Sequence, residues 1–135
     1  MLILAETTNM LAEARTGEKY QELLEKAVQM VESRGFNQIR TQLDGYDQPQ
    51  PFSQKKEDIT YVPDISASND RGKFYFEIAQ KTEDVEHLVS KWKLLATVAS
   101  MKNGGLNILV PYGHNRFTQD ILDNYNISAN LIKLN

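Results

Sequence analysis

The sequence contains no cysteine, which excludes disulfide bridges, thiolate zinc sites and cysteine nucleophiles. Nothing in the composition argues for an oxidising compartment, so a reducing cytoplasm is the expected location. Long apolar runs are also missing, because nowhere do about eighteen apolar residues follow one another as a membrane-spanning helix needs. The opening residues MLILAE have no basic leader and too short an apolar run for a signal peptide, so we expect no membrane partner.

An excess of basic residues is absent as well. The 15 Lys and Arg stand against 18 Asp and Glu, which gives a formal net charge of -3 and a pI near 5.4. Proteins that coat nucleic acid by bulk attraction need a net or local excess of positive charge, so this balance disfavours that class. The charges are uneven, however, and many acids precede residue 60. The sequence therefore leaves open the hypothesis of a local basic face. That face would consist of Arg71, Lys73, Lys81, Lys91, Lys93, Lys102 and Arg116.

Length and composition indicate one globular domain. With 135 residues, 41% hydrophobic and 24% charged, the chain can bury one core and needs no linker. We expect a single domain over residues 1–135, with residues 1–17 as an N-terminal arm. Residues 44–57, which begin DGYDQPQP, break all periodicity and predict a long loop, either a partner-binding element or a disordered segment.

Two amphipathic helices are predicted from apolar residues at helical spacing. The first spans residues 18–34 and is followed by Gly35, a typical C-terminal stop. The second is expected to start at Thr82, whose hydroxyl can accept from the exposed first amides, and to end at the Gly104-Gly105 pair.

Alternating or buried apolar runs predict the strands. They lie at residues 36–43, on both arms of a hairpin within 61–81, at 106–110 and at 127–134, with a short helix before the last strand. The order is therefore helix, three strands with a hairpin, helix, strand, and then an appended helix and strand. It predicts an α/β fold with one mixed β-sheet flanked by helices.

The hairpin YVPDISASNDRGKFYFEIAQK carries an acid on each arm. If its turn NDRG is centred on the middle bond, antiparallel pairing sets Asp64 opposite Glu77, and directly opposed side chains have Cβ atoms about 4.5–5.5 Å apart. Like charges at that separation are unfavourable without a cation between them, and hard oxygen ligands suit Mg²⁺ or Mn²⁺. The pair predicts a metal site, and two solvated surface acids are the alternative.

These residues, taken together, resemble a known group. Pro63-Asp64, the hairpin and the apolar strand that ends in Glu77 resemble the PD-(D/E)xK nuclease superfamily, and the ESRGF, PDI and FYFEIA blocks are most similar to the archaeal Holliday-junction resolvase and its relatives, over about residues 18–111. The resemblance implies the restriction-endonuclease-like α-β-β-β-α-β core and a Mg²⁺-dependent DNA endonuclease. It implies that Asp64 and Glu77 bind the metal, with the Ile78 carbonyl completing the shell.

Two departures from the family pattern concern the chemistry. The resemblance implies a lysine two residues after Glu77, where this chain has Ala79, so Lys81, one step further along the same strand face, is expected to position the nucleophile. The resemblance also implies a metal-linked glutamate on the inward face of the first helix, and no glutamate of this helix lies on the apolar stripe. The glutamates concerned are Glu18, Glu22 and Glu25.

Two functions stay open on the sequence. In the first, the chain is an active Mg²⁺-dependent endonuclease that binds DNA. In the second, which the acidic pI and Ala79 favour, it is an inactive nuclease-fold module for nucleic-acid or protein binding. His114, where a strand gives way to a helix, is either a phosphate contact or proton donor, or an unengaged loop histidine. A homodimer formed through the second helix or the last strand is open as well.

Overall fold

A five-stranded mixed sheet forms the centre of the computed structural model, which describes residues 17–56 and 58–134. The expected arm at residues 1–17 lies outside this range apart from its last residue. The strands stand in the order β1 (Asn37–Thr41), β4 (Ile65–Ser68), β5 (Lys73–Ile78), β6 (Leu106–Pro111) and β7 (Asn130–Leu134). β1, β4 and β5 pair antiparallel, whereas β5, β6 and β7 are parallel. The predicted α/β class with a mixed sheet is confirmed.

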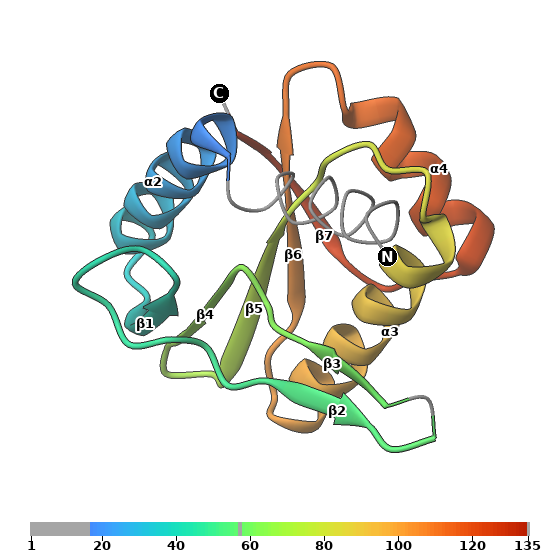
Figure 1. The fold of residues 1–135 in the computed structure, drawn as a ribbon. Coiled ribbons are helices and arrows are strands. Elements are labelled where there is room, and N and C mark those ends of the chain that lie inside the picture. The colour runs from blue at the N-terminus through green and yellow to red at the C-terminus, as the bar shows by residue number, and fades with distance from the viewer. Residues whose placement is uncertain (1–16, 57, 135) are drawn as a thin grey trace, which may run out of the picture.

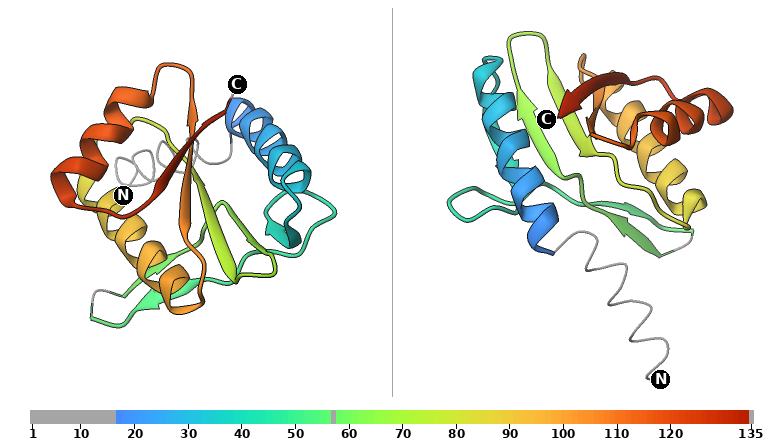
Figure 2. Two further views of the ribbon diagram at one scale, coloured as in Figure 1. Left: turned by 180° about the vertical axis from the view of Figure 1, so that it is seen from behind. Right: turned by 90° about the horizontal axis from the view of Figure 1, so that it is seen from above.

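Helices cover both faces of this sheet, as Figure 1 and the right-hand view of Figure 2 show. α2 (Glu18–Ser33) lies on one face, and α3 (Val85–Met101) and α4 (Asn115–Tyr125) lie on the other. Alternation along β5 divides its side chains between the two cores: Phe76 packs in the α2 core and Tyr75 in the α3 core.

α2 forms where the helical spacing predicted it. Its buried residues recur at three- and four-residue steps along one face, and Gly35 follows with φ +87°, a conformation that side chains with a Cβ rarely adopt. The buried face consists of Tyr20, Leu23, Leu24, Ala27, Val28 and Val31. Its first buried residue, Tyr20, is the one that reaches the candidate site.

The β4–β5 hairpin has the predicted register. Asn69 shapes the turn, because its Oδ1 accepts from the backbone N–H of Arg71 at 2.9 Å and of Gly72 at 3.3 Å. Ile65 then pairs with Phe76, so that residue 64 and residue 77 face each other at the end of the ladder. A slip of one residue would move the apolar set to the other face.

The two glycines Gly72 and Gly104 let this hairpin turn abut the turn between α3 and β6. A Cβ on Gly104 would lie 1.7 Å from the carbonyl oxygen of Lys73, and one on Gly72 would lie 2.2 Å from that of Lys102. Backbone contact this close fixes the end of α3 against the start of β5. The crossover from β5 to the parallel β6 therefore has a defined path over the sheet.

The start of α3 differs from the prediction. Its N-cap is Asp84 rather than Thr82, and the Asp84 Oδ1 accepts from the His87 N–H at 3.1 Å. Thr82, two residues earlier, instead accepts from the Asp84 N–H at 3.1 Å. Both residue types are good N-caps, and the residue nearer the apolar stripe of the helix becomes the N-cap of α3.

The predicted loop at 44–57 was wrong in part, because it contains a strand. β2 (Phe52–Gln54) pairs antiparallel with β3 (Ile59–Tyr61) as a separate two-stranded ribbon. The ring of Phe52 packs edge-on against Tyr75 with centroids 5.6 Å apart, which holds the ribbon over the α3 face. Tertiary packing holds these strands in place, because three residues are too short a run for alternation to predict a strand.

The outer strands are shorter than predicted. β1 begins at Asn37 and its pairing with β4 is irregular up to Arg40, where Gln38 has φ +52°. β7 begins at Asn130 rather than at residue 127, because the Ile127 N–H donates to the Leu122 carbonyl at 3.0 Å and closes the end of α4.

Candidate functional site

Asp64 and Glu77 lie together where β4 begins and β5 ends. Both are buried, at 5% and 0% exposure. The backbone N–H of Asp64 donates to Glu77 Oε2 at 2.7 Å, so the Glu77 carboxylate lies within hydrogen-bond distance of the residue opposite it. The two carboxylates contact different layers, Asp64 through Tyr20 of α2 and Glu77 through Lys91 of α3, but the predicted opposition of residues 64 and 77 in the hairpin is present. It follows from the register, which pairs Ile65 with Phe76 one position further in.

The carboxylate of Asp64 prolongs the hairpin ladder and ties it to α2. Oδ2 accepts from the Ile78 N–H at 2.8 Å, and Oδ1 accepts from the Tyr20 hydroxyl at 2.6 Å. The Asp64 carbonyl accepts from Thr41 Oγ1 at 3.0 Å, which joins the site to β1. Hydrogen bonds to an ionised acceptor are stronger than neutral ones, so these donors hold the side chain in one place.

Glu77 faces the opposite layer and meets a lysine from α3. Lys91 Nζ lies 2.9 Å from Glu77 Oε1, and the two side chains are 10% and 0% exposed. Lys91 occupies an inward position of α3, between the buried Leu88 and Leu95. A buried carboxylate needs such a counter-charge, because desolvation of an unpaired ion is costly.

Sequence reasoning missed the role of Lys91. The signal was available, since a lysine three residues after Leu88 and beside Trp92 stands on the apolar stripe rather than on a solvated face. Lysine on such a stripe is rare unless it is paired. Which acid it would pair with, however, depends on how α3 crosses the sheet.

Lys81, the lysine predicted to position the nucleophile, does not continue the strand. β5 ends at Ile78, and the side chain of Lys81 is exposed. The backbone amides of Tyr75 and Ala79 donate to Gly105 and Leu109, a series whose next acceptor would be the Pro111 carbonyl.

His114 interrupts that series. The His114 N–H donates to the Pro111 carbonyl at 3.1 Å, and the His114 Nδ1 accepts from the Lys81 N–H at 3.2 Å. Strand alternation therefore no longer directs Lys81 towards Glu77, and the expectation that it lies one step along the same strand face was wrong.

No glutamate of α2 occupies the inward position next to the acids. Glu18, Glu22 and Glu25 are all exposed, as the apolar stripe predicts. The α2 side chain that reaches the acid pair is Tyr20, which donates to Asp64 and is 3% exposed. A neutral hydroxyl thus contacts Asp64 from the helix where the family resemblance implies a third carboxylate.

The acid pair has the donor chemistry of a small magnesium or manganese site. Across the described ranges 17–56 and 58–134, no three His, Cys, Asp or Glu side chains gather closely enough to hold a metal. Mg²⁺ is commonly held by one or two carboxylates while it keeps several waters, so carboxylate oxygens such as those of Asp64 and Glu77 are of the kind that this ion prefers. They do not fit zinc, for which three or four nitrogen or sulfur ligands are usual.

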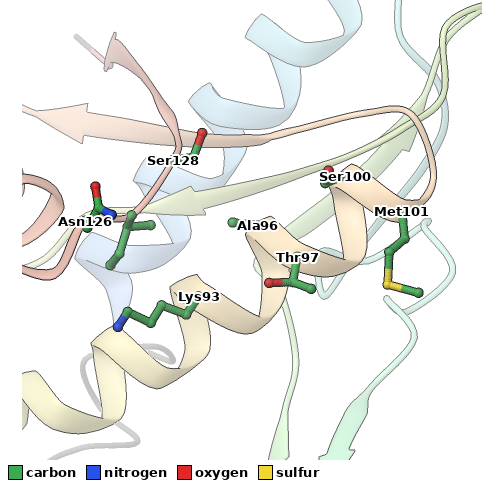
Figure 3. A pocket seen from close by; sticks show the side chains of 8 residues that line it. Lys93, Ala96, Thr97, Ser100, Met101, Asn126 and Ser128 are labelled. Carbon is green, nitrogen blue, oxygen red and sulfur yellow. The ribbon is translucent and has the colours of Figure 1, made fainter.

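Two further cavities lie away from the acids. Figure 3 shows a pocket of about 480 Å³ between α3 and the segment before β7, lined by Lys93, Thr97 and Ser100 on the helix and by Asn126 and Ser128 opposite. A smaller one of about 270 Å³ is lined by Arg40, Lys73 and Asp47 among others. Burial and the charges of Lys102 and Arg40 lower the pKa of Lys73 from its ordinary value. Neither cavity includes Asp64 or Glu77.

The chain matches no protein-family model, no curated protein and no solved structure. Among the residues that the structure describes, there is no helix of the length and apolar character that crossing a membrane requires. Any functional statement therefore depends on the acid pair, its lysine and the fold that assembles them.

Proposed function

We propose that this chain is a Mg²⁺-dependent DNA endonuclease of the PD-(D/E)xK type, with Lys91 in place of the lysine that the motif lacks. The observation that carries the proposal is the Lys91 ammonium 2.9 Å from Glu77 Oε1, beside the buried acid pair. Carboxylates that can hold a metal and an ammonium that can stabilise developing charge are groups that metal-assisted phosphodiester hydrolysis uses.

The order of elements supports the restriction-endonuclease-like fold. One helix is followed by antiparallel β1, β4 and β5, then by α3, which crosses over to the parallel β6. This is the α-β-β-β-α-β order of that fold, with β2 and β3 inserted as a ribbon and with α4 and β7 added. It sets the start of β4 and the end of β5 side by side, where the acids stand.

Each residue of the site has a defined role in the proposed reaction. Asp64, Glu77 and the Ile78 carbonyl would hold the metal, which when bound would supply Lewis acidity and a more acidic water. Lys91 orients the attacking water and offsets negative charge at the phosphorus. The Tyr20 hydroxyl keeps the Asp64 carboxylate in position. Because Lys91 comes from α3, the lysine approaches from a different element than strand β5.

Cleavage assays test this proposal. Branched, nicked and linear DNA are incubated with Mg²⁺ or Mn²⁺ and with the wild type, Asp64→Asn or Lys91→Met. We expect metal-dependent cleavage by the wild type and a loss of about 100-fold or more in both variants, in the range seen when a single proton-transfer or charge-stabilising group is removed.

Lys93→Met is the matched control, because Lys93 is an exposed lysine on the same helix. It should cut like the wild type. Equal inactivity of the wild type and Asp64→Asn on all substrates would reject the endonuclease, and full activity of Lys91→Met would reject the assignment of Lys91.

A second candidate, an inactive nuclease-fold module that binds nucleic acid or protein, is favoured by a specific observation. Glu77 is 0% exposed, and the acid pair already has protein donors in Ile78, Tyr20 and Lys91. Such a network is stable without a metal. Calorimetric titration with Mn²⁺ separates the two: binding that Glu77→Gln abolishes supports the nuclease, and absence of binding at millimolar Mn²⁺ supports the module.

A further inference from the structure

The acid pair shares one edge of the sheet with three connecting segments. β5, β6 and β7 are parallel, so their carboxyl ends lie at the same edge, the upper edge in Figure 1. Glu77 is near the end of β5, and Lys81, His114 and Lys133 stand after or at the ends of β5, β6 and β7. In sheets with parallel strands, this edge is where ligands usually bind.

His114 has a defined protonation pattern at this edge. Its Nδ1 accepts from the Lys81 N–H at 3.2 Å, so in the neutral ring the proton sits on Nε2, which becomes a donor. Burial, and then the nearby Lys81 charge, lower the pKa of His114 from its ordinary value of 6.5. At neutral pH this residue is therefore an uncharged N–H donor.

Tyr112 stands beside it as an exposed aromatic ring. It is 97% exposed and is followed by Gly113, whose φ of +89° allows the tight turn. With Asn115 and Lys133 it lines a hollow of about 290 Å³. A ring with so little buried surface adds almost nothing to folding, whereas an aromatic face among cations is typical of surfaces that bind unpaired nucleotides.

Three exposed cations stand along this edge. They are Lys81 in the loop after β5, Arg116 in α4 and Lys133 in β7. Two acids follow Lys81 closely: Asp84 is engaged as the α3 cap, and Glu83 is exposed.

We propose that this edge binds an unpaired nucleotide of single-stranded or branched DNA, with Tyr112 stacked on the base and with Lys81, Lys133 and the His114 Nε2–H on the flanking phosphates. The inference rests on the proposed function and narrows its substrate from DNA in general to DNA with unpaired nucleotides next to the cut. Continuous duplex keeps its bases stacked on one another and offers Tyr112 no free base face.

Binding without cleavage tests the inference. The fluorescence anisotropy of a labelled twelve-nucleotide single strand, and of the same sequence as duplex, is followed in EDTA with the wild type, Tyr112→Ala and Tyr112→Phe. We expect the wild type to prefer the single strand, Tyr112→Ala to lose about 5- to 100-fold of that affinity, and Tyr112→Phe to retain it, because stacking needs the ring and not the hydroxyl.

The salt dependence of binding tests the phosphate contacts. The double variant Lys81→Met/Lys133→Met should lower the slope of log affinity against log salt by about 1.4, since each phosphate contact to a single strand contributes about 0.7. Tyr125→Ala is the matched control for Tyr112→Ala, because Tyr125 is a partly exposed tyrosine at the far end of α4.

Several results would overturn the inference. They are an unchanged affinity in Tyr112→Ala, an equal loss in Tyr125→Ala, duplex bound as tightly as the single strand, and tighter binding of RNA of the same sequence. Failure of the proposed function gives a different result, because a chain that binds single strands through Tyr112 without cutting rejects only the endonuclease. A chain that cuts DNA equally well with Tyr112→Ala and binds with unchanged affinity rejects only this inference.

Discussion

Loss of Lys91 should cost the protein much of its stability. Lys91→Met removes the ammonium that lies 2.9 Å from Oε1 of Glu77, a carboxylate that is 0% exposed. Methionine roughly fills the space of the lysine stem, so the loss comes from charge rather than from a cavity. Removal of one partner of a buried ion pair costs about 3–5 kcal/mol, out of about 5–15 kcal/mol for a whole domain.

Urea unfolding measures this loss, and the buried Trp92 provides a fluorescence signal. With a denaturant slope of about 2 kcal/mol/M, the midpoint should fall by about 2 M in Lys91→Met. Glu77→Gln/Lys91→Met should be more stable than Lys91→Met alone, because it no longer buries a carboxylate that has lost the Lys91 ammonium. Lys93→Met, at an exposed site, should stay within about 0.5 kcal/mol of the wild type.

Divalent metal distinguishes a metal site from a purely structural ion pair. If Asp64 and Glu77 bind Mn²⁺, the ion can replace the missing ammonium and should restore about 2.7 kcal/mol to Lys91→Met at a concentration one hundred times its Kd. Glu77→Gln/Lys91→Met should show no such rescue. The reasoning is refuted if Lys91→Met unfolds like the wild type, or if the double variant loses the sum of the two single losses.

Three further changes test the fold and the site. Gly104→Ala should lower the unfolding free energy by about 1–3 kcal/mol, because its Cβ would lie 1.7 Å from a backbone carbonyl, whereas Gly105→Ala, with 4.0 Å of space, should change it by less than about 1 kcal/mol; equal urea midpoints would contradict this. Tyr20→Phe should cost about 1.5–3 kcal/mol in the same assay through the lost bond to Asp64, and an unchanged midpoint would mean that this bond contributes nothing. Because the folded pKa of His114 is below 6.5, the unfolded state takes up the proton first as the pH falls; the wild type should lose stability relative to His114→Asn between pH 6.5 and the folded pKa and then level off, and a constant difference from pH 7.5 to 5 would contradict the shift.

Local patterns in the sequence were sufficient to predict the central hairpin and its register. Asn69 and Gly72 define the turn, and the alternation through Ile65 and Phe76 allows one register only, because a slip would expose the apolar face. The opposition of residues 64 and 77 follows from that register alone. α2 was predictable for a similar reason, since one helical stripe is followed by a glycine with positive φ.

Contacts between distant segments were decided only by the tertiary structure. Strand alternation predicted that Lys81 would extend β5. That prediction failed because His114 forms the hydrogen bonds that the next pair of the ladder would use. The ribbon of β2 and β3 depends on Phe52 packing against Tyr75, which no local periodicity encodes.

The sequence by itself determined which acids would stand opposite each other, because both belong to one hairpin whose turn and apolar alternation are local. Only the tertiary structure decided their partners. Tyr20 lies 44 residues before Asp64, and Lys91 reaches Glu77 from a helix whose path over the sheet depends on the packing of its apolar face and on the close backbone approach at Gly104. Helical spacing tells which face of a helix turns inward, but the packing of the layers determines which residue of the sheet that face meets.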